Sequence, residues 1–126
     1  MLLLILSVQI YASPIADESI SVPVIVGGHD GMDACLSLGV VRQGGFVGDY
    51  VDVRAGPSSK YEHVTQLVSG SYVWVCNTQD LWLAIVFSTA PKMDCWISQP
   101  INHEQAYAGP CQFGWVPESA IEIIAG

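Results

Sequence analysis

The chain has 126 residues, of which 51% are hydrophobic and 13% charged, and its formal net charge is −8 at pH 7. This length favours one small domain and leaves no room for a two-domain enzyme. Lys and Arg number 4 against 12 Asp and Glu, which argues against a nucleic-acid partner, and the negative charge opposes adsorption to anionic membrane surfaces.

The first 16 residues, MLLLILSVQIYASPIA, include 12 apolar residues and no charged residue. A helix that spans a bilayer needs about 20 apolar residues, whereas the apolar core of a signal peptide needs roughly 7–15. Small residues at Ala12, Ser13 and Ala16 offer cleavage sites. We therefore predict a signal peptide over residues 1–16 and export to the periplasm or the extracellular space; an N-terminal core strand or helix is the alternative.

Acids, Ser, Pro and Gly dominate residues 17–34, which we predict to be a flexible tether. Its β-branched run, Val22–Val26, is either disordered or an added edge strand. A domain over 35–126 follows, and its first clear strand is YVDVR, in which Val51 and Val53 alternate with polar residues. This alternation is typical of a half-buried strand.

Turn residues divide the rest of the domain into short segments. After the Gly56-Pro57 break, strands are expected at 64–68, 72–77 and 81–87. Residues 88–112 hold three prolines and two cysteines and form a long insertion. A short strand at 113–116, a tight helical turn at 117–120 and a closing strand at 121–124 end the chain. Short strands at this spacing predict an all-β fold, a small barrel or sandwich.

The four cysteines are Cys35, Cys76, Cys95 and Cys111, and none forms a C-x-x-C pair. An even, scattered set behind a signal peptide predicts disulfides rather than a zinc or redox site. Three pairings are possible. We prefer Cys95–Cys111, which closes the insertion, and Cys35–Cys76, which ties the N-terminal segment to a strand.

The segments VDVRAGPSSKYEHVTQLVSGSYVWVCNTQDLWLAIVF and GWVPESAIEII resemble bacterial SH3 (SH3b) domains. The resemblance covers roughly Cys35 to Ile124, and its secreted, cysteine-containing subgroup has cysteines where Cys76 and Cys111 stand. The matching positions are Val53, Arg54, Gly56, Pro57, Ser58, Tyr61, Val64, Leu67, Gly70, Val73, Val75, Trp82, Gly114, Trp115 and Val116. The chain departs from the pattern at Asp52, at Leu81 and in its long insertion.

The resemblance implies an SH3-like barrel of five or six short strands, with the disulfide-pinned insertion before the last strands. Gly56-Pro57 would turn the chain, with Gly tolerating unusual backbone angles. Trp82 and Trp115 would fill the centre of the barrel. The expected structural core is Val53, Gly56, Pro57, Trp82, Gly114 and Trp115.

As the resemblance implies, the expected function is that of a non-enzymatic binding module of the cell envelope, which binds peptidoglycan or its peptide stems. The alternative is a secreted protein–protein module, an accessory subunit or inhibitor of an envelope enzyme. We expect a monomer without cofactor or metal. Aromatic side chains in loops stack on sugar rings or pack on peptides, and Tyr61, Trp96 and Tyr107 are expected to line one groove.

The sequence gives less support for an enzyme or a metal-binding protein. Cys35 would need a histidine base to act as the nucleophile of a minimal cysteine hydrolase, and His29, His63 and His103 each stand alone. The same histidines lack the ligand spacing of a zinc site. We therefore predict that Cys35 belongs to a structural disulfide.

Overall fold

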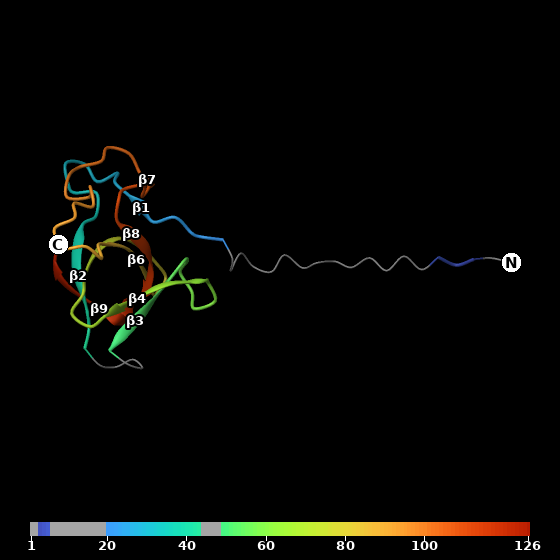
Figure 1. Ribbon diagram of the computed structural model, residues 1–126. Helices are drawn as coiled ribbons and strands as arrows, with labels where there is room; N and C mark the ends of the chain where they lie inside the picture. Colours follow the sequence, from blue (N-terminus) through green and yellow to red (C-terminus); the bar gives the residue numbers. More distant parts are fainter. Residues whose placement is uncertain (1–2, 6–19, 44–48) are drawn as a thin grey trace.

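The computed structural model describes residues 3–5, 20–43 and 49–126 (Figure 1). Nearly all of the expected signal peptide, and residues 17–19 of the expected tether, lie outside the described residues. The elements in chain order are β1 (Ile25–Val26), β2 (Ser37–Val41), β3 (Tyr50–Arg54), β4 (His63–Val68), β5 (Tyr72–Gln79), β6 (Trp82–Phe87), β7 (Gln105–Ala106), β8 (Gln112–Pro117), the 3-10 helix η1 (Glu118–Ala120) and β9 (Ile121–Ala125).

The strands form two antiparallel sheets. The larger has seven strands in the order β4-β3-β8-β6-β5-β2-β9, and the smaller pairs β1 with β7. Figure 1 shows the large sheet curling on itself, yet β4 and β9 remain its outer strands. The all-β prediction is confirmed, but the sheet is not a closed barrel. The described residues hold nine strands rather than five or six: seven form the large sheet, and the expected tether and the insertion contribute β1 and β7.

Local sequence patterns account for the strands of the large sheet. Val51 and Val53 are buried in β3, and the residues that alternate with them, Asp52 and Arg54, are half-buried. The tight turn after β8 is the 3-10 helix η1, and the closing strand β9 follows it directly. These features agree with the sequence prediction.

The large sheet carries a hydrophobic core on each face. The inner core is Val41, Val51, Val53, Leu67, Val73, Val75, Leu83, Ile85, Phe87, Val116, Ala120 and Ile121. The outer core is Val24, Val26, Ala34, Cys35, Cys76, Ala84, Val86, Cys95, Ile97, Tyr107, Cys111 and Trp115. Successive residues of β6 enter opposite cores, since side chains alternate across a strand.

The segment predicted to be a flexible tether instead packs against the outer face of the sheet from Val22 onward. The Val22 amide donates to the Ala55 carbonyl at 2.8 Å, and the Trp115 indole donates to the Val22 carbonyl at 3.0 Å. Val24 and Val26 are 0% and 1% exposed. Burial of this β-branched run opposes the entropic cost of ordering the segment. Part of it forms the edge strand β1, which pairs with β7 of the insertion.

Two disulfides tie this outer layer to the sheet. Cys35 is bonded to Cys76 of β5, and Cys95 is bonded to Cys111 beside β8. These are the two pairs preferred from the sequence. The insertion is therefore held at both of its ends, and the N-terminal segment is fixed where it enters β2.

The expected structural core needs two corrections. Trp115 is buried, at 3% exposure, but it belongs to the outer core rather than to the centre of the curled sheet. Trp82 is half-buried at the first position of β6, beside the β5–β6 turn, and it packs against the outer core. Val53, Gly56 and Gly114 are buried and Pro57 is half-buried.

Gly56 is required for a different reason from the one expected. Its backbone φ is not in the left-handed region. A Cβ at this position would instead overlap the ring of Tyr61, which lies against the glycine. The glycine therefore makes room for a ring that folds back under its own loop.

Within the described residues, no helix is long and apolar enough to cross a membrane.

Candidate functional site

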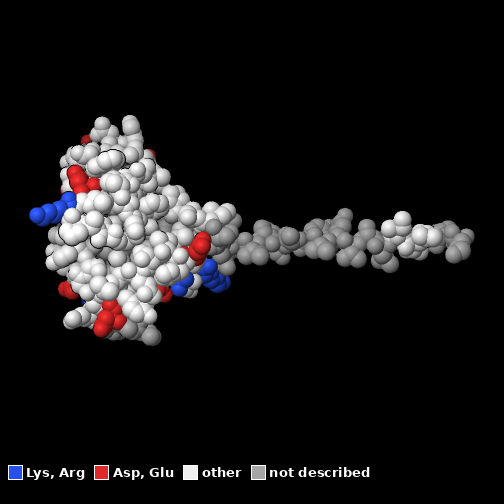
Figure 2. Space-filling model, viewed as in Figure 1, with Lys and Arg blue, Asp and Glu red and all other residues white. Residues whose placement is uncertain are grey.

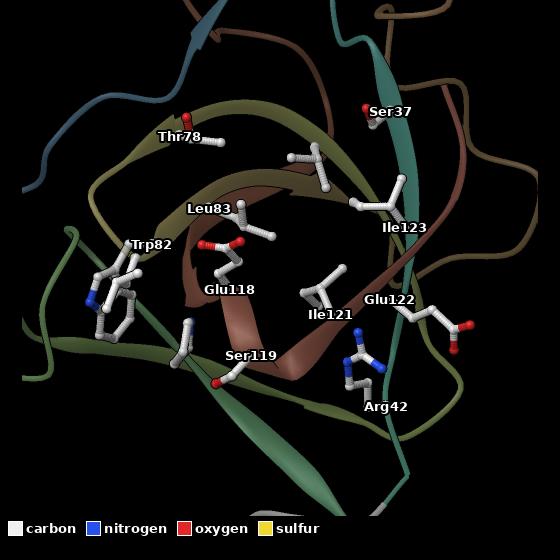
Figure 3. Close-up of a pocket in the computed structure, with 13 residues that line it drawn as sticks. Ser37, Arg42, Thr78, Trp82, Leu83, Glu118, Ser119, Ile121, Glu122 and Ile123 are labelled. Carbon is white, nitrogen blue, oxygen red and sulfur yellow. The ribbon is translucent and has the colours of Figure 1, made fainter.

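An open groove with a volume of about 970 Å³ lies at one end of the curled sheet. It lies where β2, the β5–β6 turn, η1 and β9 meet (Figure 3). We call it the main groove. Its lining residues are Ser37, Arg42, Val75, Thr78, Leu81, Trp82, Leu83, Pro117, Glu118, Ser119, Ile121, Glu122 and Ile123.

The main groove has an apolar floor and charged groups above it. Leu83 and Ile121 are buried in the inner core and form the floor. In Figure 3 the Glu118 carboxylate projects over this floor beside Leu83, Trp82 lies at one end, and Arg42 and Glu122 lie together at the other. Two carboxylates and one guanidinium at an apolar floor can hold a short segment that carries apolar, cationic and anionic groups.

A ridge separates the main groove from a smaller hollow of about 250 Å³. Trp82 and Pro117 line both depressions. On the far side of the ridge Arg54 contacts Asp52 at 3.3 Å, and His63 lies 3.3 Å from the same carboxylate. Arg54 therefore pairs with an acidic residue of its own strand, two residues earlier. These side chains are partly exposed, so the pairs add little to stability.

The structure brings together two of the three predicted ligand-binding aromatic residues. Trp96 and Tyr107 share a pocket of about 390 Å³, which we call the insertion pocket. Tyr61 is not among its lining residues and packs against Gly56 instead. The lining residues of the insertion pocket are Val26, Trp96, Gln99, Ile101, Gln105, Tyr107, Ala108 and Gly109.

Tyr107, which was predicted to line a ligand-binding groove, is buried and hydrogen-bonded to the backbone. It is 7% exposed, its hydroxyl donates to the Cys95 carbonyl at 2.9 Å, and it accepts from the Cys111 amide at 3.0 Å. Burial raises the pKa of its phenol above the ordinary value of 10.0; the Cys111 amide lowers this pKa and Asp94 raises it. Tyr107 therefore joins the two ends of the insertion beside the disulfide.

Trp96, the other predicted binding residue at this pocket, is exposed. Its side chain is 58% exposed, while its neighbours Cys95 and Ile97 are buried. Its backbone φ is 64°, in the left-handed region. Sequence position alone gave no signal for this conformation.

The charged residues of the main groove were missed by sequence reasoning. Arg42, Glu118 and Glu122 come from three separate elements, so no motif links them. One signal was available: Glu118 occupies the tight turn between two predicted strands, where a side chain stands at the end of the sheet. The proximity of Glu122 to Arg42 depends on the β2–β9 pairing, in which Val40 lies opposite Glu122.

The candidate nucleophile Cys35 has its sulfur in a disulfide with Cys76 and is 2% exposed, so it is not available as a thiolate. Among the described residues, no three His, Cys, Asp or Glu side chains lie close enough to hold a metal ion.

Nothing matches this chain among protein-family models, curated proteins or solved structures.

Proposed function

We propose that the protein is an exported, non-enzymatic binding module of the SH3b type, and that its main groove binds the peptide stems of peptidoglycan. The observation that carries the proposal is the combination in one open groove of an apolar floor with Arg42, Glu118 and Glu122 above it. A stem peptide offers small apolar side chains, carboxylates and, in many cell walls, a free amine. The glutamates suit the amine and the arginine suits a carboxylate.

Further features support this proposal. The motifs that carry the resemblance fall on β3, β4, β5, β6 and β8 in chain order, which is compatible with it. Two disulfides are consistent with an exported protein. The insertion and the N-terminal segment then form a second layer added to an SH3-like sheet.

Co-sedimentation with purified peptidoglycan sacculi tests the proposal. The oxidised protein is mixed with sacculi in moderate salt, because a chain of charge −8 is otherwise subject to unspecific repulsion. We expect saturable pelleting that Glu118→Gln and Arg42→Gln weaken. Glu62→Gln and Lys60→Gln are matched controls, since these exposed residues do not line the groove. Absence of pelleting, or equal loss in the controls, would contradict the assignment.

A protein partner is the second candidate, and one observation favours it. Within the described residues β4 pairs with β3 alone, and its side chains Val64 and Val68 are 45% and 64% exposed. An exposed, apolar outer strand is a surface on which another chain can add a strand. If sacculi fail to bind, a pull-down from an envelope fraction that Val68→Lys abolishes would support this candidate.

A further inference from the structure

The side chain of Trp96 is exposed to solvent between two neighbours that are fixed in the structure. Cys95 before it is bonded to Cys111, and Ile97 after it is 1% exposed in the outer core. The Trp96 amide donates to the Asp94 carboxylate at 2.8 Å. Its left-handed backbone, with φ 64°, is unfavourable for a bulky residue. Such conformations occur preferentially at ligand sites, where the surrounding structure imposes them.

The insertion pocket beside this indole has a distinct chemistry. Among the described residues, none of those that line it carries a charge. Gln99 and Gln105 are exposed and offer amide donors and acceptors, and Ile101 adds apolar surface. The Tyr107 hydroxyl is already bonded to the backbone. On the face shown in Figure 2, charged side chains are few and scattered, so uncharged surface is extensive.

We propose that the insertion pocket binds a neutral, N-acetylated sugar ring of a glycan chain. The apolar face of a pyranose stacks on an indole, and its hydroxyl and acetamido groups pair with amide side chains. An anionic ligand would find no lining cation and would meet a protein of charge −8. The volume of about 390 Å³ lies in the range of small-molecule sites. This site is separate from the main groove and does not rest on stem-peptide binding there.

The test is an NMR titration of the isotope-labelled, oxidised protein with tri-N-acetylchitotriose, a glycan without peptide. We expect shifts of the Trp96 indole N–H and the Gln99 and Gln105 side-chain amides, with a Kd on the order of 1 mM or lower. Trp96→Ala and Gln105→Ala should each weaken binding, the former about tenfold. Tyr72→Ala is the matched control, because Tyr72 is 65% exposed and does not line the pocket.

Two results would overturn the proposal. The first is an absence of shifts, or shifts that both pocket variants leave unchanged. The second is a response of these same signals to a free stem peptide and not to the sugar. Failure of the main-groove proposal looks different: a free stem peptide would then leave the signals of that groove, such as the Trp82 indole N–H, unshifted, whatever the sugar titration gives.

Discussion

At the scale of single residues, Tyr107 shows how one hydroxyl fixes a long loop. It bridges the Cys95 carbonyl and the Cys111 amide in a buried setting. We expect Tyr107→Phe to lower the free energy of unfolding by about 1–3 kcal/mol, because it leaves two buried backbone groups without a partner. Chemical denaturation of the oxidised protein measures this change. Tyr72→Phe is the control, and equal stability of both variants would contradict the role.

The raised pKa of Tyr107 gives stability a defined pH dependence. A phenol whose pKa is higher in the folded than in the unfolded state keeps its proton longer when folded. The unfolded state then binds fewer protons. The contribution of Tyr107 to stability is therefore constant below the ordinary pKa of 10.0 and falls as the pH rises above it. Denaturation midpoints measured from pH 8 to about 11 should fall in the wild type, and less steeply in Tyr107→Phe. Parallel curves would contradict this assignment.

Trp115 is the largest side chain of the outer core. It is 3% exposed and its indole N–H is bonded to the Val22 carbonyl. Trp115→Ala is expected to cost about 3–5 kcal/mol of stability, through lost burial and an unfilled cavity. Trp96→Ala, at an exposed position, should change stability by about 0.5 kcal/mol or less. Thermal melting of the two variants compares them directly. Similar melting temperatures would contradict the placement of Trp115 in the core.

At the scale of elements, the two disulfides differ in the length of chain they close. Cys35 and Cys76 are 41 residues apart, and Cys95 and Cys111 are 16 apart. In the chain-entropy model the longer loop contributes roughly 1 kcal/mol more. Because all four cysteines are similarly buried, replacing each pair by alanines creates comparable cavities. We expect the Cys35→Ala/Cys76→Ala protein to be the less stable in denaturant; the reverse order would contradict the entropic explanation.

The elements of the sheet were largely predictable, and those of the outer layer were not. The alternation in β3 and the turn before β9 are local patterns, so the sequence of each segment was sufficient to predict its structure. Burial of Val24 depends on β8 and on the insertion, which lie far away in the chain. Trp82 is half-buried beside the point where the β5–β6 turn contacts η1, through the hydrogen bond from the Glu118 amide to the Leu81 carbonyl, and these two segments lie far apart in the chain. The aromatic residues of the insertion drew attention to both Trp96 and Tyr107, but the sequence could not show that Trp96 is exposed and Tyr107 is buried.

At the scale of the whole molecule, β6 links the two cores, because Ile85 faces the inner one and Val86 the outer one. Neither core can be lost without exposing a face of this central strand. We therefore expect one cooperative unfolding transition, with coincident midpoints by far-UV circular dichroism and by tryptophan fluorescence. Separate midpoints would show that the outer layer unfolds independently of the sheet.

The attachment of the outer layer has a consequence for how the protein matures. A newly made chain with reduced thiols lacks both disulfides. The outer layer that covers the apolar face around Val86 and Trp115 is then no longer covalently bonded to the sheet. Under the export proposed above, this reduced form is the one that would cross the membrane. Oxidation after passage would then complete the fold, and the redox state of the compartment would control when binding becomes possible.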